Sequence, residues 1–147
     1  MATSGDTTRR VHPILAAVRH ISDELKSITD TPTWSLSDDE TREALTELTR
    51  LTARLAAAQL KVAAHAETVR VGDATGATTS AWLAGETKVT HAEAHRTLKL
   101  AGALDSEHEP VAVALAEGAL CVEQARVIVA AVDALPADLG TAVADRA

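Results

Sequence analysis

The feature that most constrains this sequence is its near lack of aromatic side chains. The 147 residues include no Phe, no Tyr and two Trp, whereas 31 of them are Ala. Only 37 larger apolar residues remain among the 68 hydrophobic ones, so the core must be thin and aliphatic. Closely packed helices with alanine at their contacts suit such a core. We therefore expect an all-α fold.

The length and the charge of the chain further limit the classes of protein to which it can belong. A chain of 147 residues suits one domain, and its net charge of −7 opposes nonspecific binding to nucleic acid. Residues 105–147 account for −6 of that charge, so any contact with phosphate must come from the first hundred residues. Cys121 is the single cysteine, which rules out an intramolecular disulfide and a paired-cysteine zinc site and favours a cytoplasmic protein. No apolar stretch approaches the ~20 residues of a membrane span.

Apolar periodicity predicts two helices in the first half of the chain. The first carries one apolar stripe, formed by Ile14, Val18, Ile21, Leu25 and Ile28. A Ser37 to Glu40 capping box begins the longest helix, which we expect to run to about Val71 and to stop at Gly72. Its expected inward face is Leu45, Leu48, Leu51, Leu55, Ala58, Val62, Ala66 and Val69.

The second half of the chain divides into two helical hairpins, Ser80 to Leu104 and Val111 to Leu135. In each, a short helix is followed by a turn and a longer helix, which resembles a helix-turn-helix unit. Two ordinary αα-hairpins are the alternative. A Thr90 to Glu93 capping box begins the longer helix of the first hairpin, whose inward positions are Ala94, Leu98, Ala101 and Leu104. The expected fold is a multi-helix bundle with one long helix and two such hairpins.

The termini differ from the helical body. Residues 1–10 are small and polar and predict a disordered N-terminus, which leaves 11–147 as a single helical domain. A further helix begins after Pro136 and stops in mid-pattern, from which we expect a chain truncated at its C-terminus.

No local motif predicts catalysis or a cofactor. His91 and His95 share a helix face at a spacing that can hold a metal, but Glu93 lies about 200° round the helix from His91 and no third ligand is near. Phosphate-binding glycine loops are absent, and the acidic residues from Asp38 to Glu43 are explained by a helix N-terminus. We therefore expect no catalytic residue, no metal, no cofactor and no small-molecule substrate.

Four segments, in order, carry a family resemblance: residues 73–83, 89–96, 100–104 and 116–128. From about residue 40 to 147 the chain resembles the bacterial "domain of unknown function 222" family, the helical region that precedes HNH endonuclease domains in proteins of high-GC bacteria. The residues carried over as structural signature positions are Asp73, Gly76, Trp82, Leu83, Glu93, Gly118, Gln124, Ala125 and Arg126.

The resemblance implies a noncatalytic helical domain of an HNH endonuclease-like protein. An HNH site needs a histidine and asparagine constellation, and this sequence contains no asparagine, so the catalytic module is missing. Cys121 departs from the family pattern, since relatives place Ser or Thr at this helix N-cap.

Three functional hypotheses remain open. The leading one is that the domain positions a nuclease on DNA or on a partner, with contacts from Lys88, His91, His95, Arg96 and Lys99. The alternative is a protein–protein interaction or dimerisation module without DNA contact, in which either the helix over residues 14–28 or the acidic final third forms the interface. The helix from Ile14 to Ile28 is either one more helix of the bundle, which we favour, or a short coiled-coil seam that joins two chains. A decayed gene fragment without its own function is the third.

Overall fold

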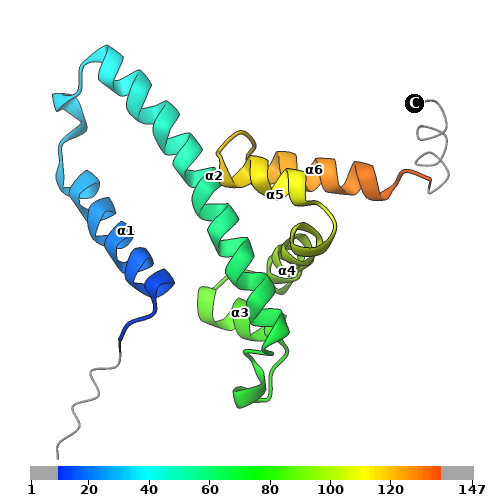
Figure 1. Cartoon of the computed structure of the whole chain (residues 1–147). Coiled ribbons are helices and arrows are strands. Elements are labelled where there is room, and N and C mark those ends of the chain that lie inside the picture. The colour runs from blue at the N-terminus through cyan, green and yellow to red at the C-terminus, as the bar shows by residue number, and fades with distance from the viewer. Residues whose placement is uncertain (1–9, 137–147) are drawn as a thin grey trace, which may run out of the picture. The chain divides into compact units, whose positions relative to one another are not determined.

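The computed structural model describes residues 10–136, which fall into two compact units divided between Arg42 and Glu43. The described residues form six α-helices and two short 3-10 helices, with no strand among them (Figure 1). The prediction of an all-α fold is confirmed. The N-terminus expected to be disordered, residues 1–10, lies outside the described residues except for Arg10, and the helix expected after Pro136 lies outside them as well.

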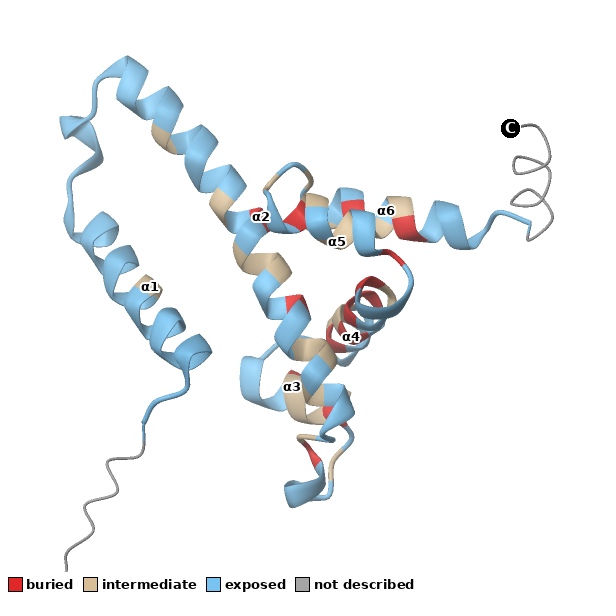
Figure 2. Ribbon diagram, in the orientation of Figure 1, coloured by how far each residue is buried: buried red, intermediate tan, exposed pale blue. Residues whose placement is uncertain are grey.

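The first unit contains helix α1, Pro13–Asp30. Pro13 occupies the first turn, and Nδ1 of His12 accepts a hydrogen bond from the Ile14 amide at 3.2 Å. No residue of α1 is buried, and its apolar stripe is exposed except at the half-buried Ile21 (Figure 2). The 3-10 helix η1, Thr33–Ser35, leads to the next helix. The predicted first helix is confirmed, with an apolar stripe that lies at the surface.

Helix α2, Asp38–Thr68, begins with the predicted capping box. The Glu40 amide donates to Oγ of Ser37 at 3.2 Å, and the Ser37 amide donates to Oε2 of Glu40 at 2.8 Å. The hydrogen bond from the Ser37 amide lowers the pKa of Glu40, because it favours the charged carboxylate.

The end of α2 differs from the prediction. The helix ends at Thr68, and Arg70 takes a left-handed conformation with φ 51°. Gly72 therefore does not stop the helix. A Cβ at Gly72 would lie 2.4 Å from the carbonyl oxygen of Ala77, so this glycine permits a close backbone approach in the loop that follows.

The face of α2 that contributes to the core is also not the predicted one. Its buried residues are Ala53 and Leu60, and Ala57 and Ala64 pack beside them. At about 100° per residue this stripe lies on the opposite side of the helix from the predicted leucine face. In that predicted face, Leu45, Leu48, Val62 and Val69 are exposed. The buried side of α2 is the one on which Leu104 and Leu115 pack against Leu60.

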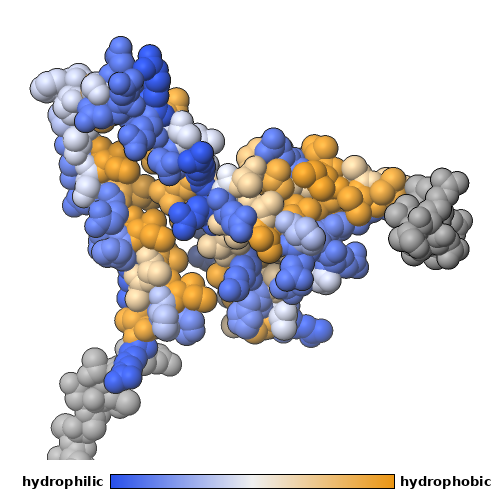
Figure 3. Space-filling view, turned by 45° about the horizontal axis from the view of Figure 1, so that its top comes forward, coloured by the Kyte–Doolittle hydropathy of each residue, from blue (hydrophilic) through white to orange (hydrophobic). Residues whose placement is uncertain are grey.

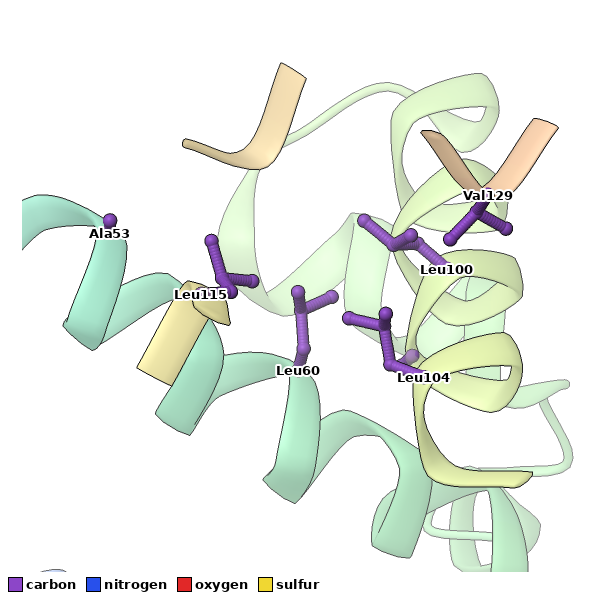
Figure 4. Packing of buried hydrophobic residues seen from close by; sticks show 7 residues of the cluster. Ala53, Leu60, Leu100, Leu104, Leu115 and Val129 are labelled. Atoms are coloured by element: carbon purple, nitrogen blue, oxygen red, sulfur yellow. The ribbon is translucent and has the colours of Figure 1, made fainter. Parts of the chain in front are cut away.

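The core of the second unit gathers side chains from four helices. Leu60 of α2 meets Leu104 of α4 (His91–Ser106) and Leu115 of α5 (Glu109–Ala116), and Val129 of α6 (Val122–Asp133) joins them (Figure 4). Leu115 is fully buried. All four predicted inward positions of α4 are buried, which confirms that stripe.

Both predicted hairpins are present. Helix α3, Thr79–Thr87, packs against α4, and α5 packs against α6. Three residues connect α3 to α4, and the first of them, Lys88, takes a left-handed conformation with φ 57°. Gly118 takes the corresponding conformation after α5 with φ 76°, and a Cβ there would lie 3.1 Å from the Arg50 carbonyl oxygen. Gly118 therefore lets the α5–α6 turn lie against the backbone of α2.

The hairpins leave apolar surface outside this core. Hydrophobic side chains gather along the α5–α6 arm in the space-filling view (Figure 3). The exposed ones on these helices and at their end are Val113, Val127, Val132 and Leu135. The core is thus as thin as the composition predicts, and a large part of the aliphatic residues lies at the surface.

Candidate nucleic-acid interface

The residues predicted to contact DNA lie on the exposed side of α4. The exposed positions between residues 91 and 102 share one side of the helix, within about 140° of arc: His91, Ala92, His95, Arg96, Lys99 and Gly102. This set contains no acidic residue. Lys88 is exposed in the turn just before the helix. All five candidate residues are therefore at the surface, and four of them form one basic and histidine-rich helix face, which we call the α4 face.

Within the α4 face, Arg96 already has a partner. Its Nη2 donates to Oε2 of Glu93 at 2.7 Å, while the arginine side chain remains largely exposed. Lys88 and Lys99 have no ion pair with any of the residues that the structure describes. The two lysines are therefore positive charges of this surface that no acidic side chain among the described residues neutralises.

Glu93 also pairs across the fold, because its Oε1 accepts a hydrogen bond from Nη2 of Arg126 at 2.9 Å. Arg126 lies on α6, so this ion pair links the start of α4 to the start of α6. The hydrogen bonds from Arg126 and then from Arg96 lower the pKa of Glu93. Thr90 accepts from the Glu93 amide at 3.1 Å as predicted, but the Glu93 carboxylate binds two arginines instead of completing the capping box.

Comparison with known families identifies the domain. Residues 42–147 match the family described as Domain of unknown function (DUF222). The chain belongs to the DUF222 family. No curated protein and no solved structure matches it. The comparison thus identifies a DUF222 domain in the chain, and it identifies no catalytic domain.

The positions that the family resemblance carries over as a structural signature differ in their burial in this DUF222 chain. Trp82 and Leu83 are half-buried on α3, and Ala125 is fully buried on α6. Asp73 begins the 3-10 helix η2, Asp73–Thr75, and Gly76 ends it in a left-handed conformation with φ 70°. These residues shape the second unit and are not part of the α4 face.

Among the remaining signature positions, Gln124 lies in the first turn of α6. Oε1 of Gln124 accepts a hydrogen bond from the Cys121 amide at 3.0 Å, so Gln124 caps the helix start. Cys121 occupies the N-cap itself, where sulfur is a weaker acceptor than a hydroxyl group. The structure brings together Glu93 and Arg126 from two separate motifs, which no local spacing in the sequence indicates.

Sequence reasoning missed one further group of polar side chains. His108 is buried between α4 and α5, and its Nε2 lies 2.8 Å from Oδ1 of Asp133 at the end of α6. These residues are 25 positions apart and belong to no motif, so only the fold reveals the contact.

Among the described residues, no helix combines the length and the hydropathy that crossing a membrane requires.

Proposed function

We propose that this DUF222 chain is a noncatalytic domain that contacts the phosphate backbone of DNA through the α4 face and Lys88. The observation that carries the proposal is the separation of charge. The whole chain has a net charge of −7, yet the exposed positions of α4 from residue 91 to 102 include no acidic side chain. Lysine and arginine at such a face bind phosphates by releasing condensed counterions.

The hairpin that presents this face supports the proposal. In a helix-turn-helix unit the second helix contacts DNA, and a turn of three or four residues connects it to the first helix. The α3–α4 connection has three residues, and α4 is the second helix. The family resemblance adds the biological role that we propose, which is to position an HNH endonuclease-like protein on its DNA.

A pair of charge-matched variants tests the proposal. Lys88→Gln, Arg96→Gln and Lys99→Gln together remove three positive charges from the proposed interface. The control combines Arg54→Gln, Lys61→Gln and Arg70→Gln, which removes three charges from exposed positions of α2 and the loop after it. Binding of a labelled DNA duplex is measured at low salt by fluorescence anisotropy, and circular dichroism checks that each variant keeps its helices.

We expect the interface variant to bind at least about tenfold more weakly than the wild type, and the control to bind nearly as well as the wild type. Equal losses in both variants would assign binding to net charge alone. A wild type that does not bind the duplex would refute DNA contact by this chain.

A second candidate function is self-association through α1. Its exposed apolar stripe favours this, because Ile14, Val18 and Ile28 are each about half exposed. The proposed occupant is α1 of a second copy. With Arg19 and Lys26 against Asp23, Glu24 and Asp30, α1 carries a net charge of only −1, so two copies do not repel each other strongly. An isologous pair of such stripes is the usual arrangement of a symmetric dimer.

Light scattering coupled to size exclusion distinguishes this candidate from the first. Under the self-association hypothesis the wild type is a dimer, and Ile14→Gln, Val18→Gln and Ile21→Gln together make it a monomer. The control, Val127→Gln with Val132→Gln, changes exposed apolar residues of α6 and leaves the dimer intact. A monomeric wild type refutes self-association.

A further inference from the structure

A cluster of three potential metal ligands lies at the junction of α4 and α5, beside the end of α6. It consists of Glu107, His108 and Asp133, and one ligand atom from each lies within 4.8 Å of the other two. Glu107 and His108 are adjacent in sequence and connect α4 to α5, whereas Asp133 is the last residue of α6. The packing of α6 beside this junction brings the three together. The cluster shares no residue with the α4 face.

His108 is the fixed member of this cluster. Its side chain is 7% exposed. Its backbone is also held at both ends, because its amide donates to the Ala103 carbonyl at 3.2 Å and its carbonyl accepts from the Val111 and Ala112 amides. A buried imidazole on so constrained a backbone presents Nε2 in a set direction, as a preorganised ligand does.

The two carboxylates are the adjustable members. Oδ1 of Asp133 lies 2.8 Å from Nε2 of His108, and both carboxylate residues are exposed. Zinc binds histidine nitrogen and carboxylate oxygen at about 2.0–2.2 Å, so two ligand atoms on one ion lie at most about 4.4 Å apart. Small rotations of the exposed Glu107 and Asp133 side chains bring the cluster within that limit.

The charge of Asp133 is a second observation that points to a cation. The carboxylate sits in the last turn of α6, where the partial negative charge of the helix end disfavours an anion. Glu107 adds another negative charge beside it. A divalent cation neutralises both carboxylates, whereas the hydrogen bond to His108 leaves Glu107 without compensation from this cluster.

We propose that Glu107, His108 and Asp133 form a binding site for a divalent transition-metal ion, with Zn²⁺ the preferred one. The imidazole ligand favours Zn²⁺ over Mg²⁺ and Ca²⁺, which prefer sites made of oxygen atoms alone. The ion takes the place of the hydrogen bond between Nε2 and Oδ1, the neutral imidazole carries its proton on Nδ1, and water completes the coordination on the exposed side. Binding fastens the α4–α5 junction to the end of α6.

Calorimetric titration of the tag-free 147-residue chain with Zn²⁺ tests the site. His108→Gln removes the buried ligand, and Asp133→Asn removes an exposed one at little risk to folding. His95→Gln is the control, because it removes an exposed histidine of α4 that is outside the cluster. Circular dichroism of each variant confirms its helical content.

The wild type is expected to bind one Zn²⁺ per chain, and excess Mg²⁺ is expected not to displace it. Loss of a partner in the outer shell of a metal site already weakens binding by about 10–100-fold, so each ligand variant should weaken it at least about tenfold. His95→Gln should leave the affinity unchanged. If His108→Gln does not fold, Asp133→Asn decides the outcome.

Three results would overturn the site. They are a wild type that does not bind Zn²⁺, an Asp133→Asn variant that binds it as tightly as the wild type, and a His95→Gln variant that loses binding. Displacement of Zn²⁺ by Mg²⁺ at equal concentration would reduce the cluster to a nonspecific acidic patch.

Discussion

Glu93 and Arg126 lie 33 residues apart in the sequence and form an ion pair between α4 and α6 with an N–O distance of 2.9 Å. Glu93 uses its other oxygen to bind Arg96. One carboxylate thus links the first turn of α4 to α6 and also binds an arginine of the α4 face. We expect the Glu93–Arg126 pair to stabilise the fold.

The first prediction concerns the energy of this pair. Glu93→Gln should lower the free energy of unfolding by about 1 kcal/mol, the upper end of the range for exposed ion pairs. We expect the upper end because only about a third of the Glu93 side chain is exposed. In a double-mutant cycle with Arg126→Gln, the two changes should cost less together than the sum of their separate effects. Urea unfolding measures both. Glu123→Gln is the control, since Glu123 is mostly exposed and lies 3.4 Å from Arg126. Strict additivity of Glu93→Gln and Arg126→Gln would show that the pair contributes nothing.

The second prediction is a dependence of stability on pH. Hydrogen bonds from Arg126 and Arg96 lower the pKa of Glu93 in the folded chain below its ordinary value of 4.5. The folded state therefore binds fewer protons than the unfolded state near that pH. The stabilisation is complete above pH 4.5 and is lost as pH falls through the folded pKa. The stability difference between wild type and Glu93→Gln should thus be largest at neutral pH and shrink in acid. A constant difference down to acidic pH would contradict the pairing.

The third prediction tests which side of α2 faces the core. Leu60→Ala should destabilise the chain by about 2–4 kcal/mol, because Leu60 is buried against Leu104 and Leu115. Leu45→Ala should change stability by less than about 0.5 kcal/mol, since Leu45 is exposed. Thermal or urea unfolding measures both variants. A larger loss of stability from Leu45→Ala than from Leu60→Ala would show that the predicted leucine face is the buried one.

The fourth prediction compares two glycines. Gly118→Ala should cost about 1–2 kcal/mol, because φ is 76° and a Cβ would press on the Arg50 backbone. Gly85→Ala should instead stabilise the chain by about 0.5–1 kcal/mol, since Gly85 lies inside α3 with nothing within 4 Å of a Cβ. Comparison of unfolding midpoints measures both effects. If Gly118→Ala stabilised the chain, the close approach of the α5–α6 turn to the backbone of Arg50 would be contradicted.

The sequence predicts the helices well because their signals are local. Both α1 and the Ser37 capping box follow from spacing within a few residues, and the buried stripe of α4 follows from its period. The buried side of α2 does not follow. That helix has apolar residues on two sides, and only the helices that pack on it decide which side is buried.

The candidate sites divide in the same way. Exposure of His95 and Lys99 follows from the period of α4, whose opposite side is apolar. The partners of Glu93 cannot be predicted from the sequence, because a capping box explains that residue equally well. Only the fold places Arg126 beside it. The contact between His108 and Asp133 likewise depends on how α6 lies against the α4–α5 junction.

The most direct test of the proposed function is the salt dependence of DNA binding. For duplex DNA, the slope of log affinity against log salt concentration changes by about 0.9 for each phosphate contact that is lost. We expect the slope for the triple variant at Lys88, Arg96 and Lys99 to be shallower than that of the wild type by about 2 to 3, while the charge-matched control at Arg54, Lys61 and Arg70 keeps the wild-type slope. Identical slopes for the wild type and the triple variant would contradict phosphate contact through the α4 face.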